Sequence, residues 1–128
     1  KTADFAKVTA VFLNRLKKGM TLGSDVTVKY ASGVKRMALT NEDLSVSSPY
    51  NTYQNKGLPI GPICSPSAAA IYAALYPDEQ FVSEEYLYFC SKDPSTGELH
   101  FSRTLEEHNQ AVSIYAPLWQ AYDKEQGL

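Results

Sequence analysis

A stretch of 22 residues in the middle of the chain cannot form a long helix or strand. Residues 45–66 have the sequence SVSSPYNTYQNKGLPIGPICSP, which holds four prolines and two glycines. Proline removes a backbone donor and glycine disfavours regular structure, so this segment is predicted to be a loop. Tyr50, Tyr53, Leu58 and Ile60 predict that the loop is ordered, and loops this long in compact domains are usually functional or disordered.

The length and composition fit one globular domain. The chain has 128 residues, of which 44% are hydrophobic and 20% charged. Such a chain can bury a core of its own, and disorder is excluded for most of its length. No apolar run approaches the ~20 residues that a membrane span needs, so neither a span nor a signal peptide is predicted in this stretch.

Helical spacing is clearest at the start of the chain. Over residues 4–18, apolar side chains recur at Phe5, Val8, Phe12 and Leu16, and Gly19 is a suitable helix end.

The next segments give weaker signals. Residues 20–33 fit either a strand or a short helix, and residues 41–44 fit one helical turn after a polar cap. Ser65 and Pro66 are predicted to cap and open a helix that ends before Pro77.

The last third of the sequence predicts a β-hairpin and a helix. Residues 86–90 and 98–102 fit strands joined by a turn over residues 93–97. Thr104 and Glu107 match a capping box, and Pro117 is predicted to kink the following helix or to start a new segment. The predicted fold class is therefore α+β, with an N-terminal helix, a long ordered loop, a short helix, a hairpin and a C-terminal helix.

Charge is unevenly distributed. Residues 1–36 hold eight Lys and Arg against two Asp, whereas residues 37–128 hold four against twelve Asp and Glu. A basic third can attract nucleic acid, a membrane or an anionic wall polymer, and it can equally be a solvated helix face. No phosphate-binding loop or zinc spacing is present, so no nucleic-acid partner is predicted.

Metal and cofactor chemistry has no support in the sequence. Cys64 and Cys90 lie far apart without a CxxC or Cys/His cluster, so no metal site is predicted. One disulfide and two thiols both remain open. His100 and His108 fall in a predicted strand and helix, where a structural role is expected.

The central loop has the chemistry of a carbohydrate groove. Its aromatic faces can stack on sugar rings, and its Asn and Thr side chains can bind hydroxyls. Glycine allows close backbone approach, and proline stiffens the loop. A rigid surface loop packed by its own tyrosines is an equal alternative. The side chains and backbone positions concerned are Tyr50, Asn51, Thr52, Tyr53, Asn55, Gly57, Pro59, Gly61 and Pro62.

Five segments, in order, resemble the signatures of a known family. They are VFLNRLKKGM (11–20), SDVTVKY (24–30), SPYNTY with GLPIGPI (48–63), YLYF (86–89) and HFSRTLEEHN (100–109). Together they cover nearly the whole chain. On these residues the chain resembles the YceG-like endolytic murein transglycosylases (MltG), some of which have the older label aminodeoxychorismate lyase.

The resemblance implies a cell-wall lyase that needs no cofactor. Such enzymes cut nascent peptidoglycan strands between N-acetylmuramic acid and N-acetylglucosamine and leave 1,6-anhydro ends. They have a lysozyme-like catalytic domain outside the cytoplasm, held by a single-pass membrane anchor. Expected partners are peptidoglycan strands and cell-wall synthases, with membrane contact only through an anchor outside this chain.

One family feature is missing. The family's catalytic Glu lies just before the first signature, but no Glu precedes Glu42 here. We therefore expect no catalytic residue in this chain and an acid/base Glu upstream of Lys1. Residues 1–128 are then a single-domain fragment of the catalytic domain, inactive alone, without the upstream Glu segment, the LysM-like region or the anchor.

The resemblance also suggests roles for residues that are present. Asp25 is interpreted as a residue that binds sugar or orients a loop, with a structural cap as an equal alternative. Glu107 is not nominated as the acid because capping explains it. Predicted substrate-binding residues are Tyr50, Asn51, Thr52, Tyr53, Asp25, Asn14 and Arg15. For Arg15, a solvated position near the helix end is the alternative. Predicted loop-supporting residues are Gly57, Pro59, Gly61, Pro62, His108 and Asn109, the last two through backbone carbonyls.

Two other functions are alternatives for this sequence. A non-catalytic glycan-binding module would use the same groove without any acid. A pyridoxal-phosphate lyase, as the older label implies, needs a buried Schiff-base lysine and a phosphate cup. Lys17, Lys18, Lys56 and Lys92 lie on polar faces or in loops, and no phosphate loop is evident.

Overall fold

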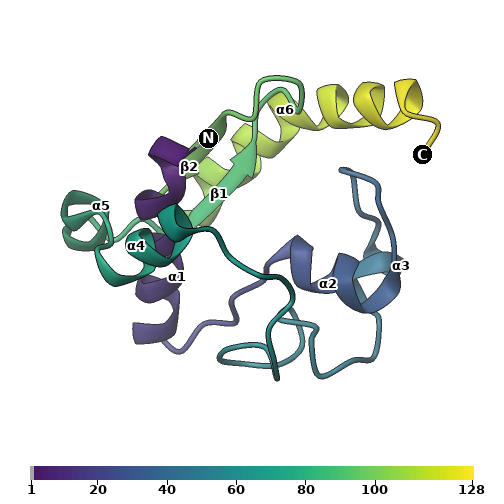
Figure 1. Ribbon diagram of the computed structural model, residues 1–128. Helices are drawn as coiled ribbons and strands as arrows, with labels where there is room; N and C mark the ends of the chain where they lie inside the picture. Colours follow the sequence, from purple (N-terminus) through teal and green to yellow (C-terminus); the bar gives the residue numbers. More distant parts are fainter. Residues whose placement is uncertain (1) are drawn as a thin grey trace.

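Helices and one small antiparallel sheet make up the α+β fold predicted from the sequence. The computed structural model describes residues 2–128 (Figure 1). The elements, in chain order, are η1 (Thr2–Asp4), α1 (Phe5–Lys17), α2 (Asp25–Ser32), α3 (Asn41–Leu44), α4 (Ala68–Leu75), α5 (Glu79–Ser83), β1 (Tyr88–Ser91), β2 (Leu99–Ser102) and α6 (Leu105–Glu125).

The first helix lies at the centre of one half of the molecule. Ala10 and Val11 of α1 are almost completely buried, because α4, α5 and β1 all pack against this helix. It ends at Lys17, and Gly19 follows with φ at +68°, a conformation that glycine adopts without strain. The helix predicted over residues 4–18 is confirmed.

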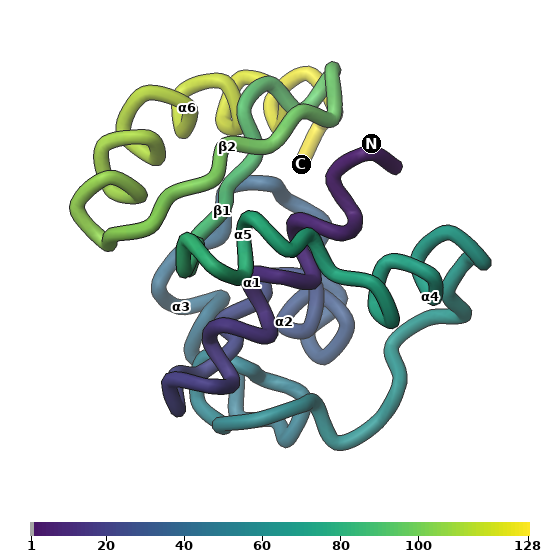
Figure 2. The backbone as a smooth tube through the Cα atoms, turned by 90° about the vertical axis from the view of Figure 1, so that its left-hand side faces the viewer, coloured from purple at the N-terminus to yellow at the C-terminus, as the bar shows by residue number. Residues whose placement is uncertain are grey.

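The hairpin lies between α1 and α6. Alternate residues of a strand point to opposite faces, and the ring contacts follow this rule. Phe89 of β1 meets Phe12 of α1 with ring centroids 5.7 Å apart, whereas the next residue back, Tyr88, stacks on His108 of α6 at 5.1 Å. Helix α4 packs on α1 and helix α6 packs on the hairpin, and the two helices lie on opposite sides of this pair of elements (Figure 2).

The other half consists of α2, α3 and the central loop, below the hairpin in Figure 1. Its link to α6 is the buried carboxylate of Asp123, which accepts hydrogen bonds from the backbone N–H groups of Met37 at 2.7 Å and Ala38 at 2.9 Å. The segment before α3 is thereby attached to the C-terminal end of α6.

The short helices show the limits of local signals. Residues 25–32 form a helix, so the strand alternative for residues 20–33 is wrong. Helix α4 is capped by Ser67, not by the predicted Ser65, because the Ser67 hydroxyl accepts from Ala70 N–H. Helix α5 was not predicted, although Asp78 after Pro77 is a good N-cap and accepts from Phe81 N–H.

The long loop, the hairpin and the last helix match prediction more closely. Residues 45–66 contain neither helix nor strand, as predicted, and β1 begins two residues later than expected. Helix α6 runs without interruption through Pro117, so the prediction of a new segment there is wrong. The Thr104 hydroxyl accepts from Glu107 N–H as expected, but the Glu107 carboxylate accepts from Arg103 N–H instead of completing the box at Thr104.

The two cysteines are free thiols. Cys64 is exposed and Cys90 is buried in β1, where burial raises the pKa of its thiol to about 11. Within residues 2–128, no helix is both long and apolar enough to cross a membrane.

Candidate functional site

The central loop is held by two side chains that point inwards. Asn51 is fully buried, and its Nδ2 donates to the carbonyls of Leu44 at 2.9 Å and Val46 at 2.8 Å, while its Oδ1 accepts from Tyr53 N–H. The hydroxyl of Thr52 is buried against that of Thr27 at 2.9 Å. These two side chains fix the loop conformation, and the predicted sugar contact by them stays a prediction.

The side chain of Tyr53, the next residue of the loop, extends towards α2. Its hydroxyl donates to the carboxylate of Asp25, the first residue of α2, which is exposed. Burial first, and then the neighbouring Asp25 charge, raise the pKa of the Tyr53 hydroxyl above its ordinary value. The phenol therefore stays protonated and remains a donor near neutral pH.

Arg15 joins this loop to the hairpin. Its Nε donates to Thr21 O and its Nη1 to Leu87 O, both at 2.9 Å. The guanidinium lies 5.2 Å from the centroid of the Tyr88 ring, and burial lowers the pKa of this group. A cation is thus held at the junction of α1, the hairpin and Tyr53.

His108 completes the cluster from the side of α6. Its ring stacks on Tyr88, and its Nδ1 is buried without a hydrogen-bond partner in the described chain. Burial, and then the positive charge of Arg15, lower the pKa of His108, so the imidazole is neutral near pH 7. Because Nδ1 has no acceptor in the described chain, the tautomer with its proton on Nε2 has the lower free energy.

We refer to Arg15, Asp25, Tyr53, Tyr88 and His108 as the junction cluster. Of these residues, Tyr88 was not among the sequence candidates, since an aromatic residue in a strand signals packing first. His108 was predicted to brace the loop through carbonyls. Its Nδ1 makes no such bond, and in the described part of the chain Asn109 makes no side-chain hydrogen bond.

Asn14 lies beside Arg15 in sequence but has an internal role. It is buried, and its Nδ2 donates to the carbonyls of Phe81 and Tyr86, both at 3.0 Å. The side chain therefore ties α1 to the segment that leads into β1.

The rest of the loop packs around Tyr50. Its ring lies 4.8 Å from that of Tyr30 in α2, centroid to centroid. A Cβ at Gly61 would come within 3.0 Å of the Tyr50 hydroxyl, so glycine permits this close approach. Gly57 has φ at +85°, while Leu58 and Ile60 are exposed. The predicted support by Gly57 and Gly61 thus has a conformational basis, and the support predicted for Pro59 and Pro62 stays a prediction.

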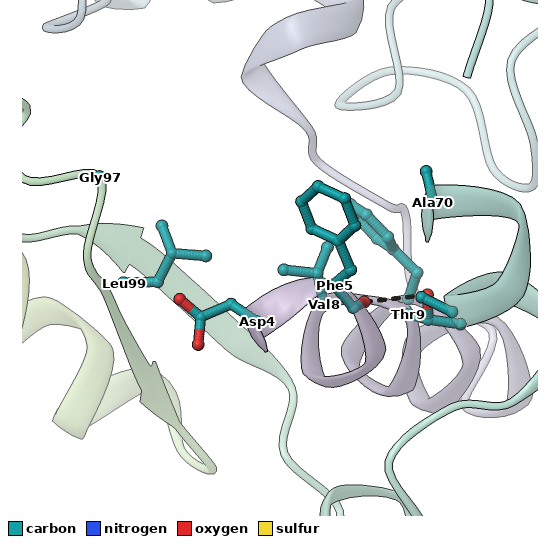
Figure 3. Close-up of a pocket in the computed structure, with 9 residues that line it drawn as sticks. Asp4, Phe5, Val8, Thr9, Ala70, Gly97 and Leu99 are labelled. Atoms are coloured by element: carbon teal, nitrogen blue, oxygen red, sulfur yellow. Dashed lines mark hydrogen bonds between the residues drawn. The ribbon is translucent and has the colours of Figure 1, made fainter. Parts of the chain in front are cut away.

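A separate hollow of about 360 Å³ lies between the start of α1, α4 and the hairpin (Figure 3). It is lined mainly by apolar side chains such as Phe5, Val8 and Leu99, and it includes none of the predicted substrate-binding residues.

Within residues 2–128, no group of three or more His, Cys, Asp or Glu side chains is placed to hold a metal ion.

The junction cluster can bind and orient a polar ligand. It offers a cation, a carboxylate, a protonated phenol and aromatic faces within one junction, and these groups suit the hydroxyls, amides and apolar faces of sugars. The carboxylate of the cluster belongs to Asp25, which accepts from the Tyr53 hydroxyl, and none of the cluster residues is a Glu.

Two curated proteins are similar to this chain in sequence. An endolytic murein transglycosylase of Bacillus subtilis (strain 168) is 47% identical over 113 residues, which are 88% of this chain and 30% of that protein. One of Streptococcus pneumoniae serotype 2 (strain D39 / NCTC 7466) is 33% identical over 118 residues, 88% of this chain and 20% of that protein. The present chain thus spans less than a third of either relative.

A solved structure has the same fold. A yceG-like protein from Listeria monocytogenes superposes with a TM-score of 0.70 and 48% sequence identity, over 80% of this chain and 32% of that chain. The model of the YceG-like family matches residues 1–114. The match includes every residue of the junction cluster, and the chain therefore belongs to the YceG-like family.

Proposed function

We propose that the protein to which this chain belongs is an endolytic peptidoglycan lytic transglycosylase. The observation that supports this most is that the SPYNTY loop, α1 and the hairpin meet at the junction cluster. The chain in which they meet is 47% identical to an endolytic murein transglycosylase. The proposed substrate is a glycan strand of peptidoglycan.

In this reaction the bond from C1 of N-acetylmuramic acid to O4 of N-acetylglucosamine breaks. One carboxylic acid with a raised pKa protonates the leaving O4, and its carboxylate then takes the proton from the 6-hydroxyl of the same muramic residue. That hydroxyl forms the new bond to C1 and closes the 1,6-anhydro ring. No water is consumed and the acid is regenerated.

The described residues supply the groove in this proposal. The carboxylate of Asp25 and the hydroxyl oxygen of Tyr53, whose proton is donated to Asp25, present acceptors to the sugar, and Arg15 anchors this wall to the hairpin. Asn51 and Thr52 hold the loop in shape from behind. The acid is proposed to be a Glu upstream of Lys1, so residues 1–128 bind glycan without cleaving it.

The same proposal includes the setting of the whole protein. Its substrate lies outside the cytoplasm, so we propose that a membrane anchor elsewhere in the protein holds this domain on the outer side. Cell-wall synthases, which make the strands, are the proposed protein partners.

A paired digestion tests this function. Purified glycan strands are treated with residues 1–128 or with a longer form of the protein that starts upstream and includes the proposed Glu, and mass spectrometry detects 1,6-anhydro ends. We expect these ends only with the longer form. Within that form, Tyr53→Phe should lower kcat/KM about tenfold, because one charge-assisted hydrogen bond is lost, whereas Tyr72→Phe on exposed α4 should have no effect.

The other outcomes are equally informative. Anhydro ends produced by residues 1–128 would place the acid within this chain. Binding of glycan by both forms without anhydro ends would overturn the lyase and favour a glycan-binding module.

A further inference from the structure

Arg15 is a half-buried cation that pairs with no carboxylate among the described residues. Among residues 2–128, the ion pairs are Lys18–Glu85 and Arg36–Asp43, and Arg15 takes part in neither. Burial lowers the pKa of its guanidinium, and only tyrosine side chains oppose this effect. A charge removed from water normally needs an opposite charge or full hydrogen bonding, so this side chain is incompletely compensated.

The unused donors of this side chain are on Nη2. The Nε and Nη1 atoms donate to the carbonyls of Thr21 and Leu87, while Nη2 donates to no described residue. In the described chain, His108 Nδ1 is the one side-chain nitrogen or oxygen that is both fully buried and without a hydrogen-bond partner. Nη2 of Arg15 also has no partner in this part of the chain, so it is not fully buried and keeps contact with solvent. One end of a rigidly held guanidinium therefore remains open to a ligand.

Gly23 allows Nη2 and the Tyr53 ring to lie close to its backbone. This residue has φ at +55°, and a Cβ there would lie 3.3 Å from Nη2 and 3.4 Å from Cε1 of Tyr53. Its backbone is fixed, because Gly23 N–H donates to Thr52 O at 3.0 Å. Nη2 thus lies beside the Gly23 backbone and the edge of the Tyr53 ring, and we call this position the cradle.

The other charge in the cluster does not neutralise Arg15. The carboxylate of Asp25 accepts from the Tyr53 hydroxyl and makes no ion pair with the guanidinium. Arginine prefers carboxylate ligands because its planar fork presents several donors to two oxygens. The cradle therefore fits an oxygen of a carboxylate better than a neutral hydroxyl.

We propose that Nη2 of Arg15, at the cradle of Gly23 and Tyr53, binds a carboxylate on the glycan strand. This inference rests on the proposed function and adds that the site distinguishes acidic strands from neutral ones. Two carboxylates of peptidoglycan share this chemistry. One is the lactyl group of muramic acid in strands without stem peptides, and the other belongs to the stem peptides themselves.

The test measures the binding of three glycans of equal length to residues 1–128 by titration calorimetry. They are a neutral oligomer of N-acetylglucosamine, a stem-free peptidoglycan strand and a stem-bearing strand. We expect one of the acidic strands to bind about tenfold more tightly than the neutral oligomer, as one charge-assisted contact would give. The stem-free strand points to the lactyl group and the stem-bearing strand to the peptide.

Three variants assign the preference to the cradle. Arg15→Gln should reduce binding of the acidic strand to the level of the neutral oligomer. Gly23→Ala places a methyl group 3.3 Å from Nη2 without changing charge and should do the same. Because φ at +55° strains alanine, its binding is measured only where circular dichroism shows the folded spectrum, and it is the second test if Arg15→Gln does not fold. Lys17→Gln removes an exposed charge from the same helix and should leave the preference intact.

Equal binding of neutral and acidic strands would overturn this inference but would not contradict the proposed binding of glycan. A preference that survives both Arg15→Gln and Gly23→Ala in folded protein would also overturn it. Failure of all three glycans to bind would overturn the inference and the proposed glycan site together.

Discussion

At the scale of single residues, Asn51 has the largest predicted effect on stability. Asn51→Ala leaves the carbonyls of Leu44 and Val46, which are partly buried, and the Tyr53 N–H without their partner. We expect the free energy of unfolding to fall by about 3 kcal/mol, since each unsatisfied buried group costs roughly 1–3 kcal/mol. Urea denaturation measures this change. Asn55→Ala, at an exposed loop position, is the matched control and should cost less than about 1 kcal/mol, and equal losses would contradict the assignment.

His108 gives stability a dependence on pH. Its folded-state pKa is lowered, first by burial and then by Arg15 and His100, so the unfolded chain takes up a proton more readily. The stability due to neutral His108 is present above its unfolded pKa, about 6.5, and is lost as the pH falls below it. His108→Phe keeps a ring against Tyr88 and should flatten the fall in unfolding free energy between pH 7.5 and 5. Parallel curves for the two proteins would contradict this.

At the scale of elements, Pro117 lies inside α6 and cannot donate a helical hydrogen bond. Its side chain is exposed, so Pro117→Ala should restore the bond without disturbing a core contact. We expect the free energy of unfolding to rise by about 1–3 kcal/mol, measured by thermal and urea denaturation. Ser113→Ala, another exposed position of α6, should change it by only a few tenths of a kcal/mol. A loss of stability in Pro117→Ala would show that the proline sets the direction of the last turns, including Asp123.

At the scale of the whole molecule, Asp123 connects the two halves. An amide at this position can accept from one of the two N–H groups but presents its own NH₂ to the other. Asp123→Asn should therefore lower the free energy of unfolding by about 2 kcal/mol and speed hydrogen exchange at Met37 and Ala38. Glu125→Gln, exposed on the same helix, is the control. Unchanged exchange at these two amides would mean that the halves are held together elsewhere.

Sequence by itself determined those elements whose signals are local. The spacing of Phe5, Val8 and Phe12, the hairpin turn over residues 93–97 and the proline-rich central loop each depend on neighbours in the chain, and each is present as predicted. The elements that local signals did not determine are short helices. Residues 25–32 make too few internal hydrogen bonds for propensity to separate a helix from a strand, and the packing of Val28 settles the matter.

Only the tertiary structure decided what the candidate residues do. Asn51 and Asn14 have the same polar chemistry as a sugar-binding residue, but distant carbonyls use their donors inside the protein. Arg15 meets Tyr88 across 73 residues of sequence, and nothing local to either predicts that contact. Backbone preference acts between near neighbours, whereas the burial and pairing of a side chain depend on which distant segments fold against it.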